Sequence, residues 1–210
     1  KSKINNSNFF LLNSLLNKNY ISKRFLGNLS DNYKKVENNL LKNISKFNMI
    51  ITTGGASVGD EDHLVKALEN NGKIFFWRAA IKPGRPIAVG KIQNTYIVCL
   101  PGNPVSVQLL YAFIVKPLIL KLLGAPLKKI SAEKLKTNFS MIKKTKRLEW
   151  LRVSKKFIKN EYVIVKHPKQ GSGMISSISY SDGIVEIPEH VSSIKKGDTF
   201  DYYDFDKLFN

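Results

Sequence analysis

The sequence predicts an α/β domain followed by a small all-β domain. Up to residue 126, short apolar runs alternate with segments whose apolar residues recur at helical spacing. This alternation is typical of a mostly parallel sheet covered on both faces by helices, a three-layer α/β/α sandwich. From residue 127 onward the segments are short and alternate with period two, which favours a barrel-like β domain. We therefore predict two domains, residues 1–126 and 127–210.

The elements of the first domain follow in order. Asn6 or Ser7 can cap a first helix, and a turn at 28–31 caps a second helix. A short helix is expected over 61–70. A long apolar helix is capped by Asn103, begins at Pro104, bends at Pro117 and ends at Gly124. The predicted strands are 20–26, 47–52, 74–80, 86–89 and 95–100, of which 47–52 is expected to be buried on both faces.

The second domain shows shorter apolar segments separated by turns such as Asp182-Gly183 and Lys196-Gly197-Asp198. Period-two alternation predicts strands whose alternate side chains face a core. The predicted strands are 139–142, 148–153, 162–165, 184–187 and 199–203.

The charge balance is strongly basic, with 34 Lys and Arg against 16 Asp and Glu and a formal net charge of +18. Because Lys, Asn and Ile are all frequent, as an AT-rich coding sequence produces, we interpret most of the excess as solvated Lys. The chain lacks the interleaved aromatic and basic residues of single-strand binders. We expect no specific nucleic-acid binding, and weak duplex binding that vanishes at modest salt.

The cysteine content and the apolar pattern indicate the compartment of the protein and whether it associates with a membrane. A lone Cys99 in an apolar run excludes an internal disulfide and a thiolate metal site, which suits a reducing compartment and predicts a cytoplasmic protein. The apolar stretch 105–123 contains Gln108, Lys116, Pro117 and Lys121, so we interpret it as a core helix and expect no membrane association.

The stretch Thr53 to Asp62 reads as a ligand-binding turn between a strand and a helix. Gly54, Gly55 and Gly59 let the backbone approach a ligand closely, and the amino end of the next helix favours anions. The pattern is neither a Walker A loop nor a dinucleotide fingerprint, so alone it fits a phosphate loop and a plain tight turn equally well.

Carboxylates border the same turn. Asp60 and Asp62 would repel a phosphate unless Mg²⁺, which prefers one or two carboxylates with waters and phosphate oxygens, lies between them. Asp31 ends another predicted strand and could reach the same crevice. The structural alternative for each carboxylate is helix capping.

Two further turns carry polar groups. Lys82-Pro83-Gly84-Arg85-Pro86 holds two cations on a turn stiffened by proline, which suits an oxyanion clamp or a rigid surface corner. Pro101-Gly102-Asn103-Pro104 opens a helix with Ser106 in its first turn, where a hydroxyl and free amides can hold an anion.

Together these motifs resemble the molybdopterin molybdotransferase family, which includes bacterial MoeA and the E domain of gephyrin. The similarity rests on 53–62, 82–86 and 100–106 in this order. It extends to Ile4-Asn5-Asn6-Ser7-Asn8 and Asp31, and forward to 147–152 and 170–173. The resemblance implies a molybdopterin-binding domain over 1–126 that lacks its first strand, and a C-terminal β domain over 127–210.

The resemblance also implies a reaction, in which molybdate is inserted into adenylylated molybdopterin with release of AMP. Asp31 and Asp62 resemble carboxylates needed for activity that hold Mg²⁺, and Lys82 and Arg85 resemble molybdate-site residues of catalytic importance. The implied substrate-binding residues are Thr53, Gly54, Gly55, Ser57, Gly59, Pro101, Gly102, Asn103, Ser106, Arg147 and Ser172. We expect Lys82, Arg85, Ser106, Arg147 and Ser172 to share one pocket.

Family active sites use two N-terminal domains reached across a homodimer interface, so a homodimer is expected. By strand parity Arg147 and Arg152 face opposite sides, and the resemblance favours Arg147 for the cleft. Arg85 stands where the family often has Lys. Two alternatives remain: the molybdopterin adenylyltransferase, a single domain of the same α/β fold, and a non-enzymatic scaffold or basic binding module.

Overall fold

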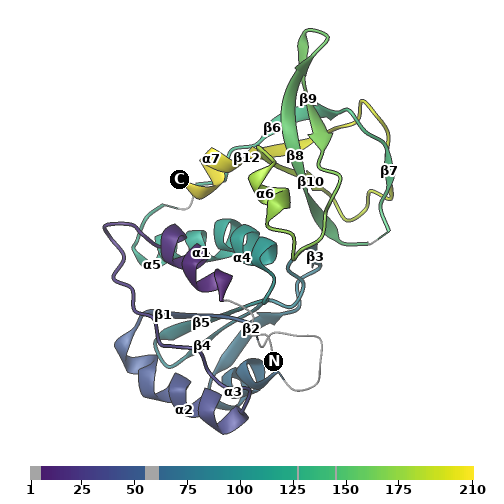
Figure 1. Cartoon of the computed structure of the whole chain (residues 1–210). Coiled ribbons are helices and arrows are strands. Elements are labelled where there is room, and N and C mark those ends of the chain that lie inside the picture. The colour runs from purple at the N-terminus through teal and green to yellow at the C-terminus, as the bar shows by residue number, and fades with distance from the viewer. Residues whose placement is uncertain (1–5, 55–61, 127, 145) are drawn as a thin grey trace. The chain divides into compact units, whose positions relative to one another are not determined.

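The computed structural model of the chain describes residues 6–54, 62–126, 128–144 and 146–210. It divides into two compact units, each described by itself below (Figure 1). Unit 1 comprises Lys1–Ala79 and Gly84–Ala125, and unit 2 comprises Ala80–Pro83 and Pro126–Asn210. The short segment Ala80–Pro83 belongs to unit 2 because its strand β3 (Ile81–Lys82) pairs with β8 (Leu148–Ile158).

The sheet of unit 1 has the strand order β1-β5-β4-β2. β1 and β5 are parallel, whereas β5–β4 and β4–β2 are antiparallel. β4 and β5 are joined by Gln93-Asn94, and a connection this short permits only antiparallel pairing. The described sheet is therefore mixed rather than mostly parallel. The bounds are β1 Met49–Thr53, β2 Lys73–Trp77, β4 Ala88–Ile92 and β5 Thr95–Leu100.

Helices cover both faces of this sheet and confirm the three-layer prediction. Figure 1 shows α2 and α3 on one face and α1, α4 and α5 on the other. Val36 and Leu40 of α2 pack with Leu68 of α3 against Ile50 and Ile97 of the sheet. The bounds are α1 Ser7–Leu15, α2 Tyr33–Asn43, a 3₁₀ turn Ile44–Lys46, α3 His63–Asn71, α4 Pro104–Leu110 and α5 Lys116–Leu122.

The long apolar helix differs from its prediction in one turn. Between α4 and α5, Tyr111–Val115 is π-helical. Pro117 has no N–H to donate to residue 113, so a change of register just before it relieves a misfit. Gly124, at φ 75°, ends the helix as predicted.

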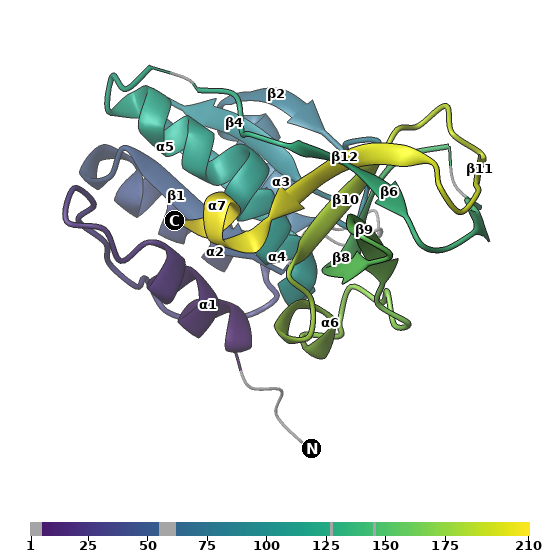
Figure 2. The ribbon, with the colours of Figure 1, turned by 90° about the horizontal axis from the view of Figure 1, so that it is seen from above.

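By length and composition alone, Pro104–Leu122 could cross a membrane. In unit 1, however, Val105, Val107 and Leu109 are fully buried. The helix α4 contacts β5, and Figure 2 shows it beside α1, with which it also makes contacts. It is therefore a core helix of this unit, as the sequence predicts.

Two predictions for the start of unit 1 are wrong. Residues 20–26 form no strand, because no described strand pairs with them. In β1 only Ile50 is fully buried, because β1 is an edge strand whose outer side opens into a cavity. That 1–126 lacks a first strand stays a prediction.

Unit 2 is built on a closed sheet, which confirms the barrel-like prediction. The strands follow the order β10-β12-β6-β9-β8, β8 pairs back with β10, and β3 extends the sheet beyond β8. Leu151, Val153, Ile164, Val185 and Tyr202 fill its core. The remaining bounds are β6 Glu133–Thr137, β7 Met141–Ile142, β9 Glu161–Lys166, α6 Ser176–Ser179, β10 Gly183–Ile187, β11 Ser193–Ile194, β12 Thr199–Asp204 and α7 Phe205–Phe209.

Candidate functional site

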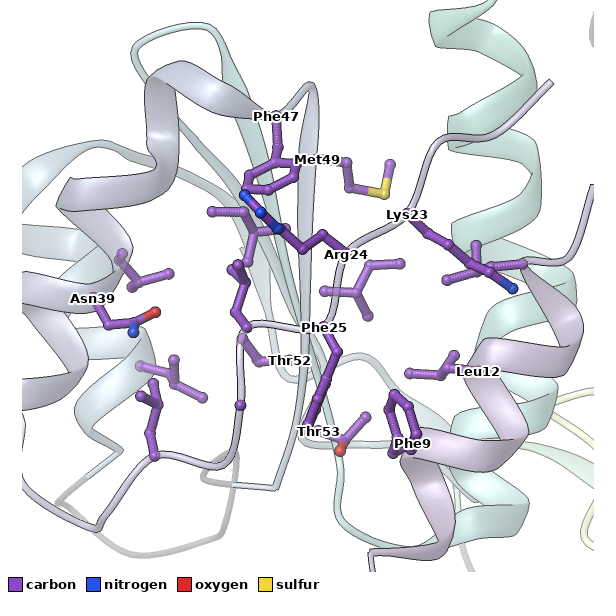
Figure 3. Close-up of a pocket in the computed structure, with 18 of the residues that line it drawn as sticks. Phe9, Leu12, Lys23, Arg24, Phe25, Asn39, Phe47, Met49, Thr52 and Thr53 are labelled. Atoms are coloured by element: carbon purple, nitrogen blue, oxygen red, sulfur yellow. The ribbon is translucent and has the colours of Figure 1, made fainter.

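A cavity of about 1200 Å³ opens along β1 within unit 1 (Figure 3). Its walls are α1, the irregular segment 20–31, β1, α2 and the end of α5. One part is lined by apolar side chains such as Phe9, Leu12 and Leu122. Polar groups gather where β1 ends: Asp31, Thr53, Gly54, Asp62 and His63. Four of these five, all but His63, are residues that the sequence singled out.

The turns that follow β1 and β5 meet at the polar end. Gly54 has φ 78°, and its N–H donates to the carbonyl of Leu100 at 3.1 Å. A Cβ at position 102 would lie 3.6 Å from the Cα of Gly54. This close approach follows from the parallel pairing of β1 and β5, which brings both carboxyl ends to one edge. The predicted residues Gly55, Ser57 and Gly59 lie outside the described residues.

The side chain of Asn8 holds the second of these turns. Its Nδ2 donates to the carbonyl of Gly102 at 2.8 Å, and the residue is 7% exposed. Its Oδ1 is buried and has no hydrogen-bond partner among the described residues. Burying an unpaired amide oxygen costs stability, so a ligand donor or a water at this point would relieve a cost already present. Asn8 was not among the predicted site residues.

Asp62 serves as the N-cap of α3. Its Oδ1 accepts from the N–H groups of Leu64 and Val65, both at 3.2 Å. Its Oδ2 is buried without a partner among the described residues. Burial raises the pKa of Asp62, and the two backbone bonds, His63 and Arg78 oppose that rise. The structural and functional interpretations are therefore compatible, since one oxygen caps and the other is available.

The residues fit a hard cation in part. Asp31 lines the same cavity as Asp62, and its carboxylate lies 3.6 Å from Nε2 of His63. The Asp31 side chain is almost fully exposed, so it could turn toward a ligand. No group of three or more His, Cys, Asp or Glu side chains among the described residues could hold a metal by itself. Two carboxylates plus substrate oxygens match the way Mg²⁺ is usually bound.

The turn 101–106 places its polar residues differently. Asn103 is the N-cap of α4 and is exposed, and its side chain makes no capping bond. Ser106 is only 2% exposed, so it is a buried hydroxyl rather than a solvated one. Pro101 is buried and Gly102 exposed at the meeting of the two turns.

The two cations of the 82–86 turn lie in different units. Lys82 belongs to unit 2, where its Nζ lies 2.5 Å from a carboxylate oxygen of the buried Glu149. Arg85 belongs to unit 1, is exposed, and has no ion-pair partner among the described residues. The predicted clamp therefore consists of one neutralised cation and one available guanidinium.

In unit 2 Arg147 precedes β8 and Arg152 lies within it, and that the two face opposite sides stays a prediction. Arg147 is half-buried and makes one long contact, 3.5 Å, to the carbonyl of Ile81. Arg152 is 1% exposed, and burial lowers its pKa to about 10, so it stays charged at neutral pH. It donates to Ser177 Oγ and to the carbonyls of Trp150 and Gly171.

Gln170 completes the anchoring of the loop that carries Ser172. Its side-chain amide exchanges two hydrogen bonds with the backbone of Arg152, at 2.9 and 2.8 Å, and also donates to the carbonyl of His167. Ser172 is half-buried in the turn between Gln170 and α6. Arg152 and Gln170 thus position a predicted site residue without being predicted themselves.

Arg78 is another residue that sequence reasoning left without a role. It has φ 64°, a conformation that few residues other than Gly adopt, and its guanidinium stacks 4.3 Å from the ring centroid of Trp77. Its charge also opposes the rise that burial causes in the pKa of Asp62. Backbone outliers of this kind cluster at functional sites.

Two protein families match the chain in sequence. The family described as "Probable molybdopterin binding domain" matches residues 1–121, more than half of the chain. The chain belongs to this family. The MoeA C-terminal region, called domain IV, matches residues 134–205. The match to the first family is thus followed along the chain by the match to the MoeA C-terminal region, and the resemblance described above is confirmed.

Relatives and solved structures agree with this. Molybdopterin molybdenumtransferase of Haemophilus influenzae is 41% identical over 122 residues, covering 58% of this chain and 30% of the relative. Molybdopterin molybdenumtransferase of Staphylococcus epidermidis is 27% identical over 202 residues, covering 95% of this chain and 48% of the relative. A molybdopterin biosynthesis MoeA crystal structure from Pyrococcus horikosii matches with a TM-score of 0.77 at 27% identity, covering 97% and 49%. This chain therefore spans about half or less of the length of these relatives.

Substitutions of Asp62 should distinguish the effect of its capping hydrogen bonds on the unfolding free energy from the effect of its buried charge. Because the folded protein raises the pKa of Asp62, the ionised form costs stability as pH rises through that pKa, and the cost is absent below the unfolded pKa. At pH 7 Asp62→Asn, which keeps an accepting oxygen, should match or exceed the parent in unfolding free energy. Asp62→Ala should fall about 1 kcal/mol below Asp62→Asn. Urea unfolding at pH 4 and 7 measures this, and equal losses for Asn and Ala would contradict it.

Substitution of Arg152 should loosen the loop that carries Ser172. Arg152→Lys keeps a charge but cannot make the three contacts of the fork, so stability should fall by about 1–3 kcal/mol. Amide hydrogen exchange at Gly171 and Ser172 should quicken more than in the strands of unit 2. Arg147→Lys, which loses one long contact, is the matched control and should change stability by less than about 0.5 kcal/mol. Unchanged loop exchange in Arg152→Lys would exclude the positioning role.

Proposed function

We propose that this chain forms the catalytic part of a molybdopterin molybdotransferase, which inserts molybdate into adenylylated molybdopterin and releases AMP. The observation that carries the proposal is the polar end of the cavity. There Gly54 and Gly102 bring two backbone turns together, and Gly54 lines the cavity with Asp62, whose Oδ2 has no hydrogen-bond partner among the described residues. Backbone turns that meet closely in a cavity lined by a carboxylate suit a phosphate ester accompanied by a cation. Membership of the molybdopterin-binding family supports the substrate class.

Each residue would then have a distinct task at the phosphate end. The backbone near Gly54 would face the pyrophosphate, and the partial positive charge at the start of α3 would favour the anion even though Asp62 caps its first amides. Asp62, held in place by its cap, and the exposed carboxylate of Asp31 would hold Mg²⁺. When bound, Mg²⁺ would offset the charge of the phosphate oxygens during hydrolysis of the adenylate. Asn8 would fix the Pro101–Gly102 turn and could direct its free Oδ1 toward a ligand donor.

For the molybdate end we propose Arg85, Lys82, Ser106, Arg147 and Ser172. Arg85 is the strongest candidate, since its guanidinium is exposed and unpaired among the described residues and offers a planar fork to an oxyanion. Lys82 would act as one member of an ion pair with Glu149, so it adds hydrogen-bond donors more than net charge. That these five residues share one pocket stays a prediction, because they belong to two units.

The wider assembly is also part of the proposal. We propose that the protein acts as a cytoplasmic homodimer. Further domains, which the greater length of the relatives allows, would complete the site. The MoeA-type match over 134–205 favours the molybdotransferase over the single-domain adenylyltransferase.

Substitution of Arg85 tests the oxyanion role. Loss of a charged hydrogen bond costs about 1.5–3 kcal/mol, so Arg85→Ala should weaken molybdate binding about tenfold or more in calorimetric titration. Arg85→Lys should lose less, since the charge survives and the fork does not. Lys128→Ala, at an exposed position, is the control and should bind like the parent. Equal molybdate affinity in all four proteins would contradict the proposed site.

A further inference from the structure

The carboxyl end of β2 lies at the same edge of the sheet as the polar end of the cavity. β2 is antiparallel to β4 and β4 is antiparallel to β5, so β2 runs parallel to β5 and β1. The registers align one residue of each strand in a row across the sheet: Trp77, Ala88, Cys99 and Thr52. Arg78 lies one step beyond this row, as Leu100 and Thr53 do. It therefore leaves the sheet level with the turns after β1 and β5, two strand spacings or about 10 Å from β5.

The backbone of Arg78 is held in a conformation that Arg seldom adopts. Its φ is 64°, and its N–H donates to the carbonyl of Ile87 at 3.0 Å. The left-handed region costs stability for a residue that is neither Gly nor Asn. The side chain of Arg78 is exposed, so burial of its apolar stem does not offset this cost. Residues kept in such conformations cluster at functional sites.

The guanidinium of Arg78 is oriented but not neutralised. It stacks 4.3 Å from the ring centroid of Trp77, whose own side chain is exposed. In the part of the chain that the structure describes, Arg78 makes no ion pair and donates no side-chain hydrogen bond. Stacking fixes the plane of a guanidinium and leaves the N–H donors at its rim available. The fork is thus preorganised for an acceptor that reaches the edge of the sheet.

The charges around Arg78 belong to the same polar edge. Its positive charge acts on Asp62, where it opposes the rise that burial causes in the pKa of the carboxyl group. Arg85 lies in the turn that leads into β4, in which the carbonyl of Gly84 accepts from the N–H of Ile87. Two exposed guanidinium groups therefore come from adjoining segments of unit 1. Cations without partners at one edge favour the arrival of an anion.

We propose that Arg78 is a further ligand-binding residue, which donates to a phosphate or pyrophosphate group at the carboxyl edge of the sheet. Trp77 is its positioning residue, since it touches the guanidinium rather than the ligand. The proposal rests on the phosphate site proposed above and adds to it a cation that no sequence motif marked. A phosphate group suits the arrangement, because two of its oxygens can accept from the fork while a third faces a cation held by Asp62.

Calorimetric titration of the 210-residue chain with inorganic pyrophosphate and with AMP tests Arg78. Arg78→Asn removes the cation and keeps a residue that tolerates positive φ. It should weaken both probes about tenfold or more, the usual effect of losing a charged hydrogen bond, without lowering the urea midpoint. Arg78→Gly, which adopts this φ without strain, is the second variant and should lose as much. Lys73→Asn is the matched control, because it removes an exposed cation from the other end of β2 and should bind like the parent.

A double-mutant cycle tests the role of Trp77. Trp77→Leu should weaken pyrophosphate binding in the parent and add no further loss to Arg78→Asn, because the ring acts through the guanidinium. Phe75→Leu, which changes another exposed aromatic residue of β2, should leave the affinity unchanged in both backgrounds. Equal losses from Trp77→Leu with and without Arg78 would overturn the positioning role, since the ring would then contact the ligand or the fold instead.

The remaining outcomes separate Arg78 from the proposed function. Parent-like binding of both probes by Arg78→Asn and Arg78→Gly would overturn the Arg78 site, even if Asp62→Asn abolishes the Mg²⁺ dependence of AMP binding. A loss for AMP and not for pyrophosphate would also overturn it, because Arg78 would then recognise the nucleoside. A loss for both probes, with parent affinity for AMP equal in Mg²⁺ and in a chelator, would uphold Arg78 and contradict only the metal role. A parent chain that binds neither probe would overturn the site outright.

Discussion

The parallel pairing of β1 with β5 is the constraint on which the rest of unit 1 depends. Its register places Thr53 opposite Leu100, so both strands end at the same edge of the sheet. The bond from Gly54 to the carbonyl of Leu100 extends the pairing into the turn, where Gly54 and Gly102 approach closely. α3 and α4 both begin just beyond these turns. The polar residues at this edge gather because of the strand pairing.

Two side chains at this edge use one polar atom to hold the fold and leave a second polar atom available to a ligand. Asp62 caps α3 with one oxygen, and its other oxygen is buried with no partner in the described part of the chain; Asn8 divides its amide in the same way. In each case one half of the side chain fixes the position of the other. Such preorganisation lowers the cost of ordering a side chain when a ligand binds. In unit 2 Arg152 and Gln170 give the Ser172 turn a comparable support.

Much of the fold could be predicted from the sequence, for local reasons. β5 lies between Asn94 and Pro101 and consists of Thr95 followed by an apolar run, and its bounds were predicted as observed. The 20–26 segment was predicted as a strand from its composition, but strand formation depends on a partner, which local sequence does not reveal. The sheet was expected to be mostly parallel, because the hairpin at Gln93-Asn94 was not recognised as one.

Site residues could be predicted where a motif marks a turn. They could not be predicted where contacts between distant parts of the chain determine a residue's role. Asp62 follows a glycine-rich turn, and this motif identified it as a candidate site residue. Asn8 is one of several asparagines near the start of the chain, and nothing local distinguishes the one that reaches Gly102. The pairing of Lys82 with Glu149 joins residues far apart in sequence, so the neutralisation of Lys82 could not be foreseen. The role of Arg152 in holding a loop emerges only from its contacts, which local sequence does not reveal.

Calorimetric titration of the chain with AMP, in Mg²⁺ and in a chelator, tests the central claim most directly. The claim is that the meeting point of the β1 and β5 turns, beside Asp62, receives a phosphate together with a cation. We expect AMP to bind in Mg²⁺ and to bind more weakly without it, and we expect Asp62→Asn to remove the difference between the two conditions. Equal affinity with and without Mg²⁺ would contradict the carboxylate–metal role, and the absence of binding in both conditions would contradict the phosphate site.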